Sequence, residues 1–462
     1  MFPVRDVERA FDIDAYNDTV MNRNIELWSQ MYQDQSPWVI NSNGLIQSAA
    51  LPSAIANEIA RLVTLELKSE VTGDSERAKY LQEQYKPVIE SIRKYCEYAC
   101  AKGGLIMKTY VDTGKLRVDY VQADSFYPVK FGSNGDITAA VFSDQRQVGD
   151  YVYTRLEYHD FNGSSEAIRN RAYKSKDASS LGSQVSLDSV EEWKDIAEEI
   201  VVNNIDKPLF VYFRIPSANN VDTSSPLGVS VFSRAVDLIR EADKQYSRIL
   251  WEFESAERAV DIDVSAVRKD EYGNDKVPQG KERLFRKFDM DGKNGDSFYE
   301  VFSPDIRDES HQRGFSNQLR LIEFNCGLAY GTLSDPSEVA KTATEMKQSK
   351  QRSYATVSDI QKSLEASLRH LIYIMNVYTT LYGLAPQGEY DVSYVWDDSI
   401  VVDAEAERLR DLQEMRDGVL SKWEYRAKWY GEDEETAKAK IQEAKNESQT
   451  DDEILGFNGG GA

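Results

Sequence analysis

Between about residues 46 and 101, apolar residues recur at intervals of three and four, which is the spacing of one helical face. Leu51-Pro52 opens such a stretch, and proline is favoured in the first turn of a helix. The same face continues through Ile55 to Val63. The pattern predicts one helix after Leu51 and a second over residues 75–101.

From residue 103 the apolar residues alternate with polar ones, which is the period of a β-strand. Asp112-Thr113-Gly114-Lys115 separates two such runs and predicts a tight hairpin. Further runs indicate an antiparallel meander that ends near Tyr173, followed by a surface loop over the serine-rich residues 174–188. The expected strands cover residues 105–111, 116–121, 126–131, 137–142, 151–158 and 207–215.

Helical spacing returns after Gly228 and continues for about thirty residues, with Phe253 as the last apolar residue of its face. Residues 259–304 are polar, with several glycine-containing turns and short β-like runs, so we expect a small β-rich insertion there. A second helix follows over residues 305–330. The sequence therefore predicts two long helices that flank a compact tip.

Gly331-Thr332-Leu333-Ser334 interrupts that second helix. Asp335-Pro336-Ser337-Glu338 then supplies the cap, the proline and the acid of a new helix start. The apolar face that follows extends to Tyr382, so this helix is expected to be about forty-five residues long, or about 65–70 Å. A compact monomeric domain rarely needs a helix of that length.

The C-terminal part of the chain has the pattern of charged helices, after a strand-like segment over residues 390–396. Ser421 and Glu424 form a capping box at the start of one of these helices. The glycine-rich end, residues 457–462, is expected to be a mobile tail. Helices are predicted over residues 404–416, 421–430 and 432–446.

Composition indicates a folded and acidic protein. The 462 residues include 17 Phe, 7 Trp and 26 Tyr, too many aromatic residues for a disordered chain. The net charge is −23, which argues against wrapping nucleic acid through clusters of Lys and Arg. Three cysteines without a CxxC pair give no disulfide framework, and we expect an intracellular protein. Neither a secretory signal nor a membrane span is predicted.

Catalytic motifs are missing from the sequence, and its three histidines offer little acid–base chemistry. His370 lies beside the apolar face of the long helix and is expected to be a partly buried packing residue. His159 and His311 have no partner at a useful spacing. Paired carboxylates carry little information, because 78 acidic residues guarantee such pairs by chance. The sequence therefore predicts neither an enzyme nor a cofactor.

The strongest candidate for a metal site is the acidic segment from Asp289 to Glu300, which resembles a calcium-binding loop. Lys293 occupies a ligand position, and Asn294 stands where glycine is required, so we interpret the segment as an acidic turn. Cys96 and Cys100 lie one helical turn apart, but no second pair completes a site, and packing is the simpler interpretation. No metal is expected.

Six short strings, in order along almost the whole chain, resemble those of portal proteins of tailed bacteriophages, in the branch found in siphophages. The first two lie at the start and near the end of the first long helix, the third opens its return, and the others follow. They are Pro226-Leu227-Gly228, Trp251-Glu252-Phe253-Glu254, Ser303-Pro304-Asp305-Ile306-Arg307, Lys341-Thr342-Ala343-Thr344-Glu345, Asp397-Asp398-Ser399-Ile400 and Gly418-Val419-Leu420-Ser421-Lys422.

This resemblance implies an α+β, mainly helical portal fold that assembles into a ring, usually of about twelve subunits. Its parts are placed by their order along the chain. They are a wing of N-terminal helices and an antiparallel β meander (1–227), stem helix 1 (228–257), a β-rich clip (258–304), stem helix 2 (305–330), a tunnel loop (331–340), a long wing helix with a return strand (341–402), and a helical crown with a flexible tail (403–462).

The resemblance also implies a function without an active site. Double-stranded viral DNA would enter the capsid through the ring during packaging and leave through it on infection. The tunnel loop, with Ser334, Asp335, Pro336, Ser337, Glu338 and Lys341, and the stem arginines Arg313 and Arg320 would face the channel. An acidic channel wall with few cations would let DNA slide. The clip residues expected to dock partners are Arg268, Lys269, Asp270, Lys281, Arg283, Arg286 and Lys287.

The implied partners are further copies of the chain, double-stranded DNA, the large terminase, a head completion or adaptor protein, and the major capsid and scaffolding proteins. The implied location is the portal vertex of the virion capsid, after assembly in the bacterial host cytoplasm. Two alternatives stay open. Another ring-forming head–tail connector would normally be much shorter, and an intracellular hydrolase with paired acids would need a deep pocket and a monomeric or dimeric state.

Overall fold

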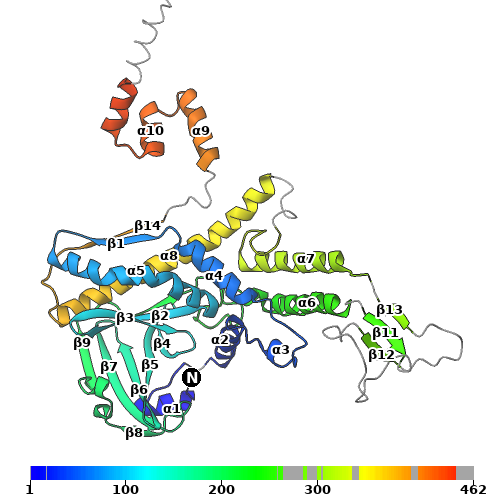
Figure 1. The fold of residues 1–462 in the computed structure, drawn as a ribbon. Coiled ribbons are helices and arrows are strands. Elements are labelled where there is room, and N and C mark those ends of the chain that lie inside the picture. The colour runs from blue at the N-terminus through cyan, green and yellow to red at the C-terminus, as the bar shows by residue number, and fades with distance from the viewer. Residues whose placement is uncertain are drawn as a thin grey trace, which may run out of the picture. The chain divides into compact units, whose positions relative to one another are not determined.

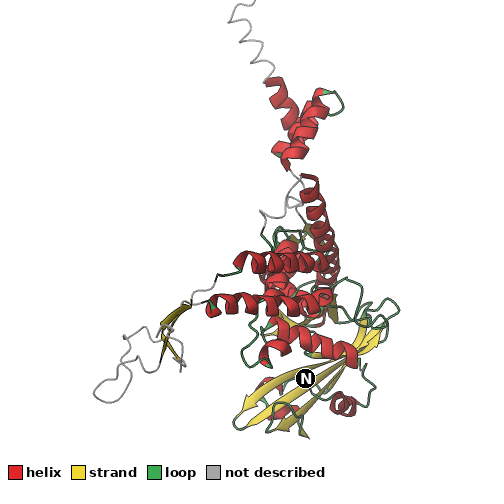
Figure 2. Ribbon diagram, turned by 90° about the vertical axis from the view of Figure 1, so that its right-hand side faces the viewer, coloured by secondary structure: helices red, strands yellow, loops and turns green. Residues whose placement is uncertain are grey.

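The computed structural model describes residues 2–16, 18–256, 259–263, 285–288, 299–302, 305–335, 343–396 and 404–443. The chain divides into two compact units, Met1–Val395 and Trp396–Ala462. Figure 1 and Figure 2 show the helices and sheets of the larger unit. Mixed helix and sheet, as expected, make up its architecture.

Five helices precede the first long strands of the larger unit. Both helices expected in this region, α4 (Leu51–Thr64) and α5 (Glu76–Lys102), are confirmed. The sequence patterns gave no prediction for α1 (Val4–Phe11), α2 (Thr19–Tyr32) or α3 (Pro37–Ile40). α2 nevertheless has a clear local start signal, since Asp18 accepts hydrogen bonds from the N–H groups of Val20 and Met21.

A small antiparallel sheet contains the predicted hairpin. β2 (Gly104–Asp112) and β3 (Lys115–Gln122) are joined by Thr113 and Gly114, both with positive φ, as a tight hairpin turn requires. The predicted strand after residue 207 is confirmed as β10 (Phe210–Arg214). It does not follow the meander in space, because it pairs with β2 to form the order β10-β2-β3.

The second sheet has six strands and confirms the predicted antiparallel meander that ends near Tyr173, whereas the predicted hairpin belongs to the smaller sheet. Its order is β4-β5-β6-β7-β8, with β9 also paired to β7. The serine-rich segment predicted to be a loop includes β8 and a short 3₁₀ helix, and β9 was not predicted. The strands are β4 (Phe126–Phe131), β5 (Ile137–Val148), β6 (Tyr151–Phe161), β7 (Ser165–Ser175), β8 (Ser183–Val185) and β9 (Glu199–Asn203).

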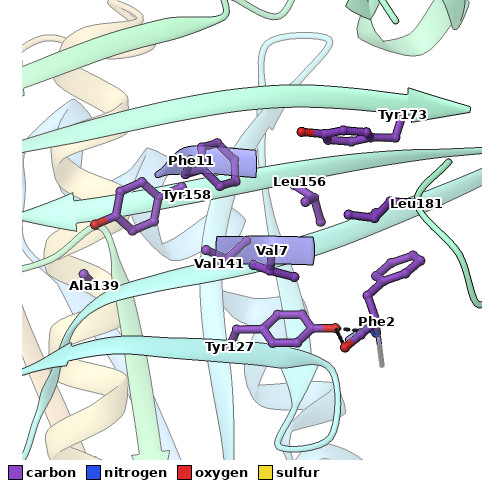
Figure 3. Close-up of a cluster of buried hydrophobic side chains, with 10 residues drawn as sticks. All are labelled: Phe2, Val7, Phe11, Tyr127, Ala139, Val141, Leu156, Tyr158, Tyr173 and Leu181. Atoms are coloured by element: carbon purple, nitrogen blue, oxygen red, sulfur yellow. Dashed lines mark hydrogen bonds between the residues drawn. The ribbon is translucent and has the colours of Figure 1, made fainter. Parts of the chain in front are cut away.

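Helix α1 covers one face of this sheet with apolar side chains. Val7 and Phe11 lie against Val141 and Leu156, as Figure 3 shows. The Tyr127 hydroxyl donates a hydrogen bond of 3.1 Å to the Phe2 carbonyl, which fixes the N-terminal segment beside β4. The N-terminal residues are thus part of the core of the larger unit.

A buried ionic cluster joins the two sheets. His159 on β6 binds Glu157 through Nε2 at 2.7 Å and Glu166 through Nδ1. Glu157 also binds Lys108 on β2 at 2.8 Å. The expectation that His159 has no partner is therefore wrong: one partner is two residues away on the same strand face, and the other comes from β7.

The α6/α7 helix pair follows the sheets in the chain. α6 (Val236–Ser255) begins eight residues after Gly228, because a short 3₁₀ turn, Ser233–Ala235, precedes it. α7 (Asp308–Cys326) ends before residue 330, because Gly327 adopts φ 70° and caps the helix. Between the two helices, the predicted β-rich insertion includes the three-stranded sheet β12-β11-β13, formed by β11 (Ala259–Asp263), β12 (Phe285–Phe288) and β13 (Tyr299–Phe302).

The longest helix is α8 (Ala343–Leu381), whose 39 residues correspond to about 58 Å. Of its predicted start, Asp335 is the last described residue before a gap, and Pro336, Ser337 and Glu338 lie outside the described residues. Leu364, Leu368 and Leu371 are fully buried. The predicted return strand is confirmed as β14 (Asp391–Val395), and it pairs with β1 (Lys68–Thr72).

The described part of the second unit is helical, as predicted. α9 (Ala404–Arg416) and α10 (Lys422–Tyr430) are followed by a helix over residues 434–443. The capping box predicted at Ser421 and Glu424 is present. Tyr425 is buried within this unit, and Trp429 donates a hydrogen bond of 2.9 Å from Nε1 to Asp411.

Candidate functional site

The α6/α7 helix pair and the segment that follows α7 form the candidate site. The two helices lie side by side (Figure 1, Figure 2). Tyr246 on α6 packs against Phe315 on α7, with 6.2 Å between ring centroids. Nearby, Gln245 and the His311 Nδ1 atom are 3.1 Å apart, within hydrogen-bond distance. His311 thus has a partner that the sequence did not indicate, since it comes from the other helix.

A bidentate ion pair between Arg307 and Glu252 joins the start of α7 to the end of α6, next to the insertion. Arg307 donates from Nε to Glu252 Oε1 at 3.0 Å and from Nη2 to Oε2 at 2.7 Å. The backbone N–H of Arg307 also donates to Glu252 Oε1 at 3.1 Å. These hydrogen bonds lower the pKa of Glu252 to about 2. The carboxylate is therefore held ionised as the link between α6 and α7.

This ion pair corrects the apolar face predicted for α6. Phe253, expected to continue the buried face, is 50% exposed, whereas Glu252 is only 8% exposed. A buried carboxylate is tolerated here because Arg307 satisfies both of its oxygen atoms. Helical periodicity does not reveal such a partner, which lies 55 residues further along the chain.

Several large apolar side chains on the α6/α7 helix pair are exposed. Trp251 is 65% exposed on α6, and on α7 Leu321 and Phe324 are 53% and 52% exposed. Buried residues on the other faces of the same helices include Ile239, Leu319 and Ile322. The helix pair thus carries apolar surface on more than one side, which is unusual for a protein that acts as a monomer.

Glu323 anchors the segment after α7. This residue is fully buried, and its Oε1 atom accepts hydrogen bonds from the N–H groups of Leu333 and Ser334 at 2.6 and 2.8 Å. The Ser334 hydroxyl also bonds to both carboxylate oxygens, at 3.2 and 3.0 Å. One carboxylate therefore fixes the chain reversal over residues 327–334.

Close packing against α8 fixes the same reversal from the other side. A side chain at Gly327 would place its Cβ 2.3 Å from the Thr356 Oγ1 atom, so only glycine fits there. The Arg352 guanidinium lies over the Phe324 ring, 4.4 Å from its centroid, and 5.3 Å from that of Tyr330. The residues before the predicted tunnel loop are thus attached to both α7 and α8.

The structure separates the predicted tunnel-loop residues. Ser334 is buried at the anchor formed by Glu323, whereas Asp335 is exposed. Ser334 therefore presents little surface to a channel. The remaining predicted loop residues, Pro336, Ser337, Glu338 and Lys341, lie outside the described residues.

The predicted arginines of the second helix both lie on α7. Arg313 is exposed and Arg320 is half-buried. Among the predicted docking residues of the insertion, Arg286 and Lys287 belong to β12. The others, Arg268, Lys269, Asp270, Lys281 and Arg283, lie outside the described residues, as do Asp289–Ser297 of the calcium-loop lookalike.

The sequence pattern did not predict that Glu323 binds the segment after α7, nor that Glu252 pairs with Arg307. A signal for Glu323 was present, because it stands four residues after Leu319 and three before Cys326, on the apolar face of its helix. An acid at such a position implies a buried partner. For Glu252 and Arg307, both residues stood in strings that marked the family resemblance, but nothing in the sequence indicated their contact.

The remaining candidates for chemistry are packing residues. Cys96 and Cys100 are free and buried. His370 is half-buried, as predicted, and its Nε2–H donates to the Pro208 carbonyl at 2.8 Å. Burial lowers the pKa of His370 to about 4, so the ring is neutral. In the described part of the chain, no helix is long and apolar enough to cross a bilayer.

These features define a protein of mixed helix and sheet, with the α6/α7 helix pair, an insertion between those two helices and the long helix α8. The family model described as "Phage portal protein, SPP1 Gp6-like" matches residues 90–452. The chain therefore belongs to this family of phage portal proteins, which are components of the virion. The resemblance seen in the sequence is confirmed.

Among solved structures, the chain is similar to one described as "Neck of native GTA particle computed with C12 symmetry". The two sequences are 11% identical, and the match covers 92% of this chain and 98% of the other, with a TM-score of 0.43. The comparison with curated proteins finds no match.

Proposed function

We propose that the chain assembles into a ring at the portal vertex of a phage capsid and that double-stranded viral DNA passes through its central channel. Membership of the portal family supports this function. The observation that carries the proposal is the α6/α7 helix pair, which leaves Trp251 and Leu321 exposed. In a closed ring, neighbouring subunits cover such apolar side chains. We propose about twelve subunits, the usual number in the family that the sequence resembles.

In this proposal the α6/α7 helix pair is the stem of the ring, and residues 258–304 are the clip. The clip would dock the large terminase during packaging and a head completion or adaptor protein afterwards. Residues 331–340 would form the tunnel loop, with Asp335 nearer to DNA than Ser334, and Lys341, directly after this loop, would be a cationic contact. The support for this last point is the anchor at Glu323, which withdraws Ser334 into the protein.

We further propose that the channel protein itself has no catalytic group. Force for packaging would come from the terminase, and the ring would guide the DNA. The net charge of −23 favours a wall that does not bind phosphates tightly. Cationic contacts would be limited to a few positions, with Arg313 and Arg320 on α7 as candidates. Scaffolding and major capsid proteins would contact the outer surface of the ring during assembly in the host cytoplasm.

Terminase binding tests the docking role separately from assembly. A variant with Lys281→Ala, Arg283→Ala and Lys287→Ala is expected to form normal rings but to lose binding of the large terminase in a pull-down and to package no nuclease-protected DNA. A matched control removes three positive charges at exposed positions elsewhere, with Lys79→Ala, Lys115→Ala and Arg117→Ala. Equal terminase binding by both variants and the original chain would contradict the proposed docking surface.

A further inference from the structure

Strand β9 leaves one edge of the six-stranded sheet open. Among the strands that the structure describes, Glu199–Asn203 pairs with β7 only. Figure 1 shows β9 on the outer side of β7, at the border of the sheet. The backbone groups along such an edge can bind another extended chain. The edge is therefore a candidate interaction surface.

The register of β9 shows which of its backbone groups point outward. The N–H of Asn170 donates to the carbonyl of Glu198 at 2.8 Å. In an antiparallel ladder the pairs that exchange hydrogen bonds alternate with pairs that do not. Ile200 and Val202, two and four residues beyond Glu198, therefore face β7 with their backbone groups. The N–H and C=O groups of Glu199 and Val201 point to the open edge.

The side chains of β9 favour strand pairing. Ile200 is 42% exposed and Val201 is 52% exposed, one on each face of the strand because successive side chains alternate. β-Branched residues are strong strand formers. Natural sheet edges are commonly protected by lysine or proline, and Glu-Ile-Val-Val-Asn contains neither. Glu199 is the one charged residue of this short strand, so the edge is protected against lysine-poor or acidic strands more than against a basic one.

The negative charge beside this edge favours a positively charged partner. The segment that leads into β9 is acidic, and its charged residues are exposed, with Lys194 as its one basic residue, whereas Trp193 is buried. Lys194 is paired with Glu191, and Glu198 lies 3.8 Å from Arg171. The acidic residues between positions 191 and 199 are Glu191, Glu192, Asp195, Glu198 and Glu199.

We propose that the open edge of β9 binds an extended basic segment of another protein, which adds to the sheet as a further strand. Main-chain hydrogen bonds to Glu199 and Val201 would supply affinity, and the acidic residues would select a positively charged sequence. A second copy of this chain fits less well, because pairing two β9 edges brings two acidic segments together. This proposal goes beyond the proposed channel function and does not rest on it.

A labelled peptide tests the proposal on the full chain. The probe is a nine-residue peptide that alternates lysine with valine around a central threonine, and binding is followed by fluorescence anisotropy. Val201→Pro removes the outward N–H and leaves the hydrogen bonds to β7 intact, so it is expected to weaken binding about tenfold. Val201→Thr keeps that N–H and is expected to bind within about twofold of the original chain.

Charge variants test the selection of a basic partner. Glu192→Gln, Asp195→Asn and Glu199→Gln together are expected to weaken binding and to reduce its dependence on salt. The control variant, Asp74→Asn, Glu83→Gln and Asp150→Asn, makes the same change in net charge at exposed acids elsewhere. A probe in which proline replaces the threonine and the following valine cannot pair along either edge and is expected not to bind.

Three results would overturn the proposal. Equal binding by Val201→Pro and the original chain would exclude strand addition at this edge. Equal weakening by the two charge variants would show unspecific attraction to an acidic protein. A change in the number of subunits for Val201→Pro would show that the edge holds a second copy. If Val201→Pro unfolds, Asn203→Pro repeats the test, because its N–H points to the same open edge.

Discussion

Glu252 and Arg307 form a bidentate ion pair that joins the end of α6 to the start of α7. The backbone N–H of Arg307 binds the same carboxylate. Because two parallel hydrogen bonds fix orientation as well as distance, this pair sets the geometry at the base of the insertion between the helices. In the proposed ring, the base of the clip would be fixed by this contact in every subunit.

Because Glu252 is ionised in its ion pair with Arg307, we expect the stability of the folded chain to fall at acidic pH. The pKa of Glu252 is lowered from 4.5 to about 2 by the hydrogen bonds from Arg307. The carboxylate therefore stabilises the folded state above pH 4.5, and this contribution is lost as the pH falls toward 2. Glu252→Gln is expected to be less stable at pH 7 and to lose less stability than the original chain between about pH 5 and pH 3.

Urea unfolding at several pH values measures this difference. Glu254→Gln is the matched control, since Glu254 is exposed and lies two residues away. Hydrogen exchange is expected to increase at the end of α6 and the start of α7 in Glu252→Gln only. Parallel pH curves for Glu252→Gln and the original chain would contradict the assigned role of the ion pair.

Removing the Glu323 carboxylate is expected to loosen only the segment that it binds, around Leu333 and Ser334. Glu323→Ala leaves the N–H groups of Leu333 and Ser334 without their acceptor, which is expected to cost about 1–3 kcal/mol in the free energy of unfolding. Faster hydrogen exchange over residues 328–335 is expected as well. Glu309→Gln, an exposed change on the same helix, is the control. Unchanged exchange in this segment would show that packing against α8 is sufficient to hold it.

The guanidinium group of Arg77 holds the C-terminal end of α8 and the residues after it, so we expect stability to depend on this group. This residue is 2% exposed, and it donates to the carbonyls of Asn376, Ala385 and Pro386 and to the Thr380 hydroxyl. Lysine cannot reproduce this fork of donors. Arg77→Lys is expected to lower the free energy of unfolding by about 1–3 kcal/mol, measured by urea denaturation. Arg117→Lys, at an exposed position on β3, should have no measurable effect.

The buried cluster around His159 predicts a loss of stability as the pH rises above 6.5. Hydrogen bonds to Glu157 and Glu166 raise the pKa of His159 above 6.5, although burial opposes this. The imidazolium therefore contributes stability that is fully present below pH 6.5 and is lost as the pH rises through the raised value. His159→Gln is expected to be less stable and to lack this decline. Urea midpoints measured from below pH 6.5 upward test it, and a decline of equal size in the variant would contradict the assignment.

Local sequence signals predicted much of the fold. The Thr113-Gly114 hairpin and the Ser421 capping box depend on a few neighbouring residues, and both were found where expected. α5 and the two helices around the insertion were found for the same reason, since an apolar face of several turns is legible in the sequence. The family itself was indicated by short strings in the right order.

Contacts between distant segments could not be predicted in the same way. β1 pairs with β14, and β10 pairs with β2, across intervals that no local pattern specifies. The partners of Glu323, Glu252 and His159 come from other elements, so each acid or imidazole was visible in the sequence without its partner. The candidate site was thus located by order along the chain, whereas its internal bonding was learned from the structure.

Assembly of the chain into a ring with a central channel underlies the proposed function. Native mass spectrometry of the purified full chain, combined with negative-stain imaging, tests it most directly. The account predicts a ring of about twelve copies with a central hole. A double variant, Trp251→Ser with Leu321→Ser, is expected to shift the chain toward smaller species, whereas Glu309→Gln is not. A folded monomer or dimer of the original chain at micromolar concentration would contradict the account.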